Sequence, residues 1–258
     1  MRTLTMVMML ALGASVASAE VRTKVVEYTQ GNTALEGFLA WDDAVQGRRP
    51  GVLIAPDWMG VGPFADSRAE QLAKLGYVAF CADIYGKGVR PSTPKQAGET
   101  AAIYKNDRPL TRARVEAALA VLRANPLVDP KRIAAIGYCF GGMVVLELAR
   151  SGADVAGVVT FHGSLDTPTP GDAKNIRCKV LALQGGDDPF VGPEVVAAFE
   201  KEMRNAHVNW ELVQYGGAVH AYTNPAAGND NAKGAAYNAQ ADRRSWQAMK
   251  DFFAEIFQ

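Results

Sequence analysis

The sequence predicts an α/β fold, in which a mostly parallel central sheet carries helices on both faces and follows an N-terminal antiparallel hairpin. Several short apolar runs lack polar alternation, which is typical of strands buried on both faces. These runs alternate with helical patterns, so successive strands are expected to be parallel and joined by crossover helices. The chain has 258 residues, 48% of them hydrophobic, which suits one large domain.

The expected elements follow one another along most of the chain. Residues 21–28 and 33–41 look like two strands joined by a turn that contains Gly31 and Asn32, a hairpin signal. Later strands are expected at 51–57, 77–86, 132–139, 155–163, 179–186 and 208–217, and helices at 65–76, 110–125, 141–152, 193–206 and 235–257. The segments 84–108 and 216–233 look irregular, and long loops in a single domain are often functional.

The first nineteen residues resemble a signal peptide. Arg2 precedes an apolar run from Met6 to Leu12, and Ala17-Ser18-Ala19 forms a small-residue cleavage site. The apolar run is too short to span a bilayer. We therefore expect a signal peptide at 1–19 and a single domain at 20–258, located in the periplasm or secreted, with no stable membrane insertion after cleavage.

Charge and cysteine content narrow the possible partners. The 27 basic and 27 acidic residues balance, which leaves no electrostatic footprint for nucleic acid. A core of this size needs no disulfide or structural metal. Three cysteines are an odd number, so at least one thiol is unpaired within the chain. Cys81 and Cys178 lie in apolar runs and are either buried core residues or partners of each other.

Cys139 lies in different surroundings, between an expected strand and an expected helix. Gly137 and Gly141 flank it in the pattern Gly-x-Cys-x-Gly, a nucleophile elbow with sulfur in place of oxygen. The neighbours two before and two after must be small, because larger side chains would collide with the turn. The helix N-terminus favours a reactive thiolate, and the amide of Phe140 is placed to donate to an oxyanion. The alternative is a glycine-rich turn with an incidental cysteine.

An elbow nucleophile needs a histidine base and an acid, in the chain order nucleophile, acid, histidine. His207 ends an amphipathic helix and is expected on the surface, and His162 precedes the acid candidates. His220 follows the last expected strand and is the natural base, although it could be an ordinary loop histidine. Asp187 and Asp188 follow the penultimate strand, and both are candidates for the acid.

The segments "GYCFGG", "GGDDPFV" and "GAVHAY", in this order and spacing, resemble the dienelactone hydrolase family of the α/β-hydrolase fold. The resemblance extends from about Val21 to the C-terminus. It implies cleavage of a small ester or lactone of the carboxymethylenebutenolidase type, through a thioester acyl-enzyme and without metal or cofactor. It also implies that Asp188 is the acid of a triad with Cys139 and His220.

The resemblance extends to "LIAPDWMGVGP" at the end of an earlier strand. There it implies that the amide of Trp58 is the second oxyanion donor. It also places Asp57 at a position where the family keeps a carboxylate, usually Glu, that holds the resting thiol. Asp57 is one methylene shorter than Glu.

The resemblance departs where the family uses two arginines to hold the carboxylate of its substrate. Lys87 or Arg90 would have to replace the first arginine, and Asn224 occupies the place of the second. A lysine offers a point charge in place of a bidentate fork, and asparagine offers no charge. An anionic dienelactone is therefore not expected as the physiological substrate.

Tyr85, Tyr138, Phe161 and Tyr222 are expected either to line an acyl pocket or to be ordinary core aromatics. Two other functions stay open at this point. The chain could be a non-catalytic binding protein that kept the fold, or it could hydrolyse peptides or amides, although no peptide groove is indicated.

Overall fold

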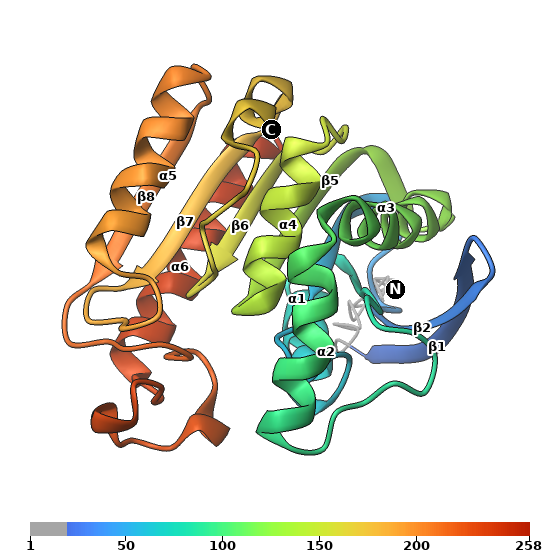
Figure 1. Ribbon diagram of the computed structural model, residues 1–258. Helices are drawn as coiled ribbons and strands as arrows, with labels where there is room; N and C mark the ends of the chain where they lie inside the picture. Colours follow the sequence, from blue (N-terminus) through green and yellow to red (C-terminus); the bar gives the residue numbers. More distant parts are fainter. Residues whose placement is uncertain (1–19) are drawn as a thin grey trace, which may run out of the picture.

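The computed structural model describes residues 20–258, so the predicted signal peptide lies outside the described residues. Eight strands form one sheet in the order β1-β2-β4-β3-β5-β6-β7-β8 (Figure 1). Their bounds are β1 (Val21–Gln30), β2 (Thr33–Asp42), β3 (Arg49–Ala55), β4 (Val78–Cys81), β5 (Val128–Tyr138), β6 (Gly157–Phe161), β7 (Lys179–Gly185) and β8 (Trp210–Tyr215).

The predicted fold class is confirmed. Strand β1 pairs with β2 antiparallel over its full length, and β2 pairs with β4 in the same sense. All pairs from β4 to β8 are parallel. The carboxyl ends of the parallel strands therefore meet at one edge of the sheet, where sites gather in such folds.

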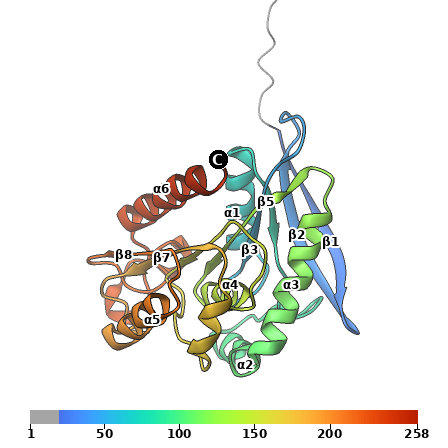
Figure 2. The same cartoon turned by 90° about the horizontal axis from the view of Figure 1, so that it is seen from above.

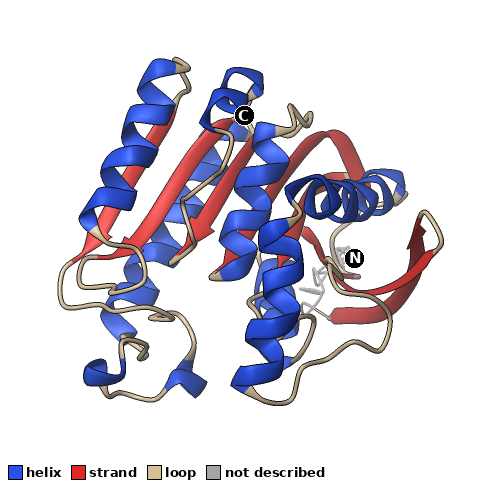
Figure 3. Ribbon diagram, in the orientation of Figure 1, coloured by secondary structure: helices blue, strands red, loops and turns tan. Residues whose placement is uncertain are grey.

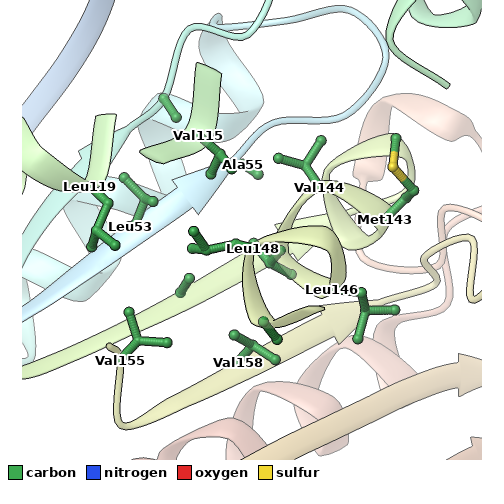
Figure 4. Packing of buried hydrophobic residues seen from close by; sticks show 14 of the residues in the cluster. Leu53, Ala55, Val115, Leu119, Met143, Val144, Leu146, Leu148, Val155 and Val158 are labelled. Carbon is green, nitrogen blue, oxygen red and sulfur yellow. The ribbon is translucent and has the colours of Figure 1, made fainter. Parts of the chain in front are cut away.

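Helices cover both faces of the sheet (Figures 2 and 3). Buried apolar side chains of α1 (Pro63–Lys74) and α6 (Ala239–Ile256) pack on one face. Those of α2 (Pro94–Asn106), α3 (Arg108–Ala124), α4 (Phe140–Arg150) and α5 (Pro193–Asn205) pack on the other. Figure 4 shows part of this second cluster, where Leu146 and Leu148 of α4 lie close to the sheet residue Val158.

Helix α2 was not expected, because residues 84–108 looked irregular. Thr93 caps it by accepting a hydrogen bond from the Gln96 amide at 3.3 Å, and Pro94 occupies its first turn. Only three of its thirteen side chains are buried, Ala97, Ala101 and Tyr104, so the apolar pattern is sparse. The segment 216–233 is irregular as expected, apart from short 3₁₀ turns at Pro225–Ala227 and Asn231–Lys233.

Helix α4 is buried along its whole length, including its charged residues. Glu147 and Arg150 form an ion pair at 3.1 Å, and Arg150 also binds Glu202 of α5 at 2.8 Å. Arg112 of α3 reaches Glu147 at 2.7 Å. Mutual pairing offsets the cost of removing these charges from water, and it joins α4 to α3 and α5. The helix that begins directly after Cys139 is thus fixed at its far end.

In the part of the chain that the structure describes, no helix is both long enough and apolar enough to cross a membrane. Cys81 and Cys178 are buried and free, so the possible bridge between them is not present.

Candidate active site

Cys139 occupies the sharp corner between β5 and α4. Its backbone has φ 53° and ψ −115°, a conformation that residues with a side chain rarely adopt. The Cys139 amide donates to the carbonyl of Phe161 at 3.0 Å, and its carbonyl accepts from the Gly142 amide at 3.0 Å. The corner therefore projects the sulfur at the carboxyl edge of the sheet, ahead of the first turn of α4.

The glycines around the corner are required by close backbone approach. A Cβ atom on Gly137 would lie 2.0 Å from the carbonyl oxygen of Gly141, and one on Gly141 would lie 2.1 Å from that of Ala55. Both separations are far inside van der Waals contact. The steric reason given for the Gly-x-Cys-x-Gly pattern therefore holds here, and β3 is seen to press against the start of α4.

The structure brings Cys139, His220 and Asp188 into one hydrogen-bonded chain. The Nε2 atom of His220 lies 3.0 Å from Cys139 Sγ, and its Nδ1 lies 2.8 Å from Asp188 Oδ2. The other Asp188 oxygen accepts from the Phe190 amide at 2.9 Å. Asp187, the alternative acid, instead accepts from the Gly217 amide at 3.0 Å in an exposed turn. Only Asp188 is thus placed to orient the imidazole.

The charges of this chain keep His220 protonated. Burial alone would lower the pKa of His220, but the charge of the Cys139 sulfur and the hydrogen bond to Asp188 outweigh it and raise that pKa from 6.5 to about 10. Both ring nitrogens of an imidazolium donate, so Nδ1–H points to Asp188 and Nε2–H to the sulfur. A His220 imidazolium therefore has an acceptor on each side, a carboxylate oxygen of Asp188 and the Cys139 sulfur.

The turn after β3 lies beside this pair. Burial raises the pKa of the Asp57 carboxyl, although the Met59 amide, which donates to it at 2.8 Å, and the charge of His220 act in the opposite sense. Tyr85 donates its hydroxyl to the Trp58 carbonyl at 2.9 Å and packs its ring 5.5 Å from that of Phe140. Across residues 20–258, neither the Trp58 amide nor the Phe140 amide donates to a protein acceptor. Both amides are thus free to bind another oxygen.

Tyr138 and Tyr222 belong to the core, which corrects their inclusion among the substrate-binding candidates. Both side chains are fully buried. Tyr138 stacks on Phe161 with ring centroids 4.7 Å apart, and the Tyr222 hydroxyl donates to the Leu183 carbonyl at 3.0 Å. Only Tyr85 of the three tyrosines lies against the turn that carries Trp58.

The candidate anchors for a substrate carboxylate are occupied elsewhere. Lys87 forms an ion pair with Glu27 of β1 at 2.6 Å. Arg90 donates to three backbone carbonyls and lies 3.6 Å from the Glu36 carboxylate of β2. Asn224 uses its side-chain oxygen to cap a 3₁₀ turn through the Ala226 amide. Each of these three side chains thus has a partner outside the triad.

Two features near the triad were missed in the sequence. The exposed ring of Phe190 lies edge-to-face on the ring of His220, with ring centroids 5.3 Å apart. The buried ring of His162 also lies edge-to-face on His220, with ring centroids 5.2 Å apart. Phe190 follows the acid by two residues, and this proximity is the signal that could have identified it. His162 was rejected as a base because of its chain order, and its contact with His220 was not considered.

A groove of about 630 Å³ lies beside Asp188. The residues that line it come from the end of β7 and the start of α5, and Cys139 is not among them. Within residues 20–258, no group of three or more His, Cys, Asp or Glu side chains is placed to hold a metal ion.

The model of the dienelactone hydrolase family matches residues 35–257. The chain belongs to the dienelactone hydrolase family. The chain is accordingly an ester or lactone hydrolase.

Several relatives span nearly the whole chain. A "Putative carboxymethylenebutenolidase" of Synechocystis sp. is 26% identical over 249 residues, which cover 92% of this chain and 98% of the relative. A crystal structure from metagenomic libraries, described as a dienelactone hydrolase-like promiscuous phosphotriesterase, is 41% identical, with a TM-score of 0.87 and coverage of 93% and 99%. A structure described as "Putative Dienelactone Hydrolase" from Klebsiella pneumoniae, at 19% identity, a TM-score of 0.78 and coverage of 91% and 99%, shares the fold.

The protonation of His220 depends on Cys139. In Cys139→Ala the sulfur charge is lost while the ring stays buried, so we expect the pKa of His220 to fall from about 10. Histidine proton NMR against pH checks this shift, with the exposed His207 as reference. The folded protein holds the His220 proton more tightly than the unfolded chain does. Its stabilising effect is therefore complete below pH 6.5 and is lost as pH rises through about 10. An unchanged His220 titration in Cys139→Ala would contradict the ion pair.

Proposed function

We propose that the protein hydrolyses a small uncharged ester or lactone through an acyl-enzyme on Cys139. The observation that carries this proposal is the hydrogen-bonded chain from Asp188 through His220 to the sulfur. An uninterrupted nucleophile, base and acid of this kind is the arrangement that covalent acyl transfer requires. A binding protein would have no need of it.

The first half of the reaction forms the thioester. The Cys139 thiolate attacks the acyl carbon, and the developing oxyanion accepts from the amides of Phe140 and Trp58. The tetrahedral intermediate collapses, and the leaving alkoxide takes the Nε2 proton of His220. Asp188 keeps the ring oriented during this transfer. The alcohol departs and leaves a neutral imidazole beside the thioester.

The second half restores the resting pair. Neutral His220 removes a proton from water as the water attacks the thioester carbonyl, and the same two amides receive the oxyanion. Collapse of this intermediate expels the Cys139 thiolate and yields the carboxylic acid. The proton taken from water stays on His220, so the thiolate–imidazolium pair is regenerated.

The acyl-enzyme is tested by substitution at Cys139. We expect Cys139→Ala to lower kcat/KM for p-nitrophenyl acetate by at least about 10³-fold, because no other group in the site can form the intermediate. Cys178→Ala, which removes a buried free thiol outside the triad, is the matched control and keeps its activity. Equal turnover by Cys139→Ala and wild type would exclude this mechanism and favour the binding-protein alternative.

The preference for uncharged substrates rests on the surroundings of the sulfur. The Asp188 carboxylate binds His220, and the Asp57 carboxyl lies close enough to His220 to feel its charge, while Lys87 and Arg90 are held by acidic residues of β1 and β2. The rings of Trp58 and Phe190 are 38% and 64% exposed and offer an apolar surface. A substrate carboxylate would therefore lose hydration without gaining a cation.

A matched pair of esters measures this preference. The p-nitrophenyl monoester of glutaric acid has the same acyl length as p-nitrophenyl pentanoate and adds a terminal carboxylate. We expect kcat/KM for the pentanoate to be roughly tenfold or more above kcat/KM for the glutaric monoester. Asn224→Arg places a cation where the family resemblance puts one. We therefore expect this variant to show a smaller difference in kcat/KM between the pentanoate ester and the glutaric monoester. A wild-type enzyme that prefers the glutaric monoester would contradict an uncharged substrate.

A second candidate substrate class is the neutral phosphotriester. The 41% identity to a structure described as a promiscuous phosphotriesterase favours it, and such triesters also carry no charge. Attack by the Cys139 thiolate on phosphorus would release the phenolate and form a phosphorylated cysteine. We expect wild type to release p-nitrophenol from p-nitrophenyl diethyl phosphate, and Cys139→Ala to release none above background. Identical rates for the two proteins would remove this candidate.

A further inference from the structure

His162, at the end of β6, has an unusual backbone that turns its ring toward the triad. Its φ is 40°, and its amide donates to the Leu183 carbonyl at 2.8 Å. Strand alternation would direct its side chain toward α4, as for Val158 and Thr160. The ring instead packs near that of Tyr138, with ring centroids 6.1 Å apart. Tyr138 belongs to the core cluster on the other face of the sheet, which α1 and α6 cover. Such conformations cost about 1–3 kcal/mol and gather at functional sites.

This ring contacts three residues of the loop that carries the base. It lies edge-to-face on the rings of His220 and Tyr222, with ring centroids 5.2 Å and 5.1 Å apart. Its Nε2 lies 2.7 Å from Thr223 Oγ1. All of these contacts are made by a side chain that is 1% exposed. His162 therefore holds the loop at three positions: at the base His220 itself, at Tyr222 and at Thr223.

Thr223 is also held from the helical layer. Its carbonyl accepts from Arg68 of α1 at 2.7 Å, and Arg68 forms an ion pair with Asp242 of α6 at 2.8 Å. The Thr223 side chain and carbonyl thus tie the base loop to the sheet through His162 and to the helices through Arg68. Thr223 itself is fully buried, so both bonds are shielded from water.

The His162 ring is neutral beside a protonated His220. Burial lowers the pKa of His162 well below 6.5, and the charges of His220 and Arg68 act in the same direction. Tyr138 and Tyr222, the other titratable groups against the ring, stay neutral because burial raises their pKa. His162 therefore cannot compete for the proton that His220 carries.

We propose that His162 is a positioning residue, which holds the His220 loop through its ring contact and its hydrogen bond to Thr223 so that Nε2 stays directed at the Cys139 sulfur. This inference rests on the proposed function, since it concerns the base of that reaction. An ordinary core histidine would contribute only to stability. The positioning role instead requires that loss of the Thr223 bond weaken the contact between His220 and Cys139.

The test compares Thr223→Val, which removes the hydroxyl while keeping the shape, with Thr223→Ser, which keeps the hydroxyl. For p-nitrophenyl acetate we expect Thr223→Val to lose roughly tenfold in kcat with little change in KM, and Thr223→Ser to stay close to wild type. Alkylation by iodoacetamide at pH 7 is expected to slow in Thr223→Val alone. It reports on Cys139, because Cys81 and Cys178 are buried. Thr223→Ala replaces the valine variant if that variant does not fold.

A double-mutant cycle separates the hydrogen bond from general destabilisation. His162→Phe keeps an aromatic ring against His220 and loses the bond to Thr223, so we expect the double variant His162→Phe/Thr223→Val to be no slower than either single variant. Additive losses would overturn the proposal, as would single variants with a lower Tm but wild-type kcat and alkylation rate. Cys139→Ala is assayed in parallel: if it stays active, the proposed function itself has failed, independently of His162.

Discussion

The site depends on the backbone corner at Cys139, where a residue with a side chain is held at positive φ. That conformation persists because the surrounding structure leaves no alternative. The Phe161 carbonyl accepts the Cys139 amide, Gly141 abuts the backbone of β3, and α4 is buried along its whole length. A packed helix with its far end joined to α3 and α5 cannot move to relax its first residue. The rigidity of this layer is therefore what holds the partly buried sulfur at the corner.

The groups around the Cys139 sulfur are arranged to favour a protonated His220 beside it. The Asp188 carboxylate accepts at Nδ1 of the imidazole and the Cys139 sulfur lies at Nε2, so a proton on His220 is stabilised at both ring nitrogens. The neighbouring His162 is kept uncharged by its burial, which avoids a second cation against the first. The nearby lysine and arginine are bound by acidic residues of the N-terminal hairpin. The hairpin thereby pairs both of these cations, without contributing a residue to the triad.

Most of the sheet and the chain order of the triad residues could be predicted, because apolar runs and glycine spacing are local signals. The helix α2 could not, since its sequence is rich in polar residues and only three side chains are buried. The choice between Asp187 and Asp188 needed the family resemblance, because neighbouring carboxylates differ only in which way the tertiary turn directs them. Tyr138 was misplaced although it adjoins Cys139, because the alternation along β5 directs its ring into the core on the opposite side of the sheet. The contact between His162 and His220 depends on a positive φ that no sequence pattern indicates.

The nucleophile and its base are separated by 81 positions along the chain. Strands β6, β7 and β8 must all be added to one side of β5 before the imidazole reaches the sulfur. During synthesis, Cys139 therefore emerges long before His220 and Asp188, its partners in the hydrogen-bonded chain. A truncated or partly folded chain lacks these contacts, which form only once the final third of the polypeptide has docked. Completion of the domain is thus what assembles the hydrogen-bonded chain from Asp188 through His220 to the Cys139 sulfur.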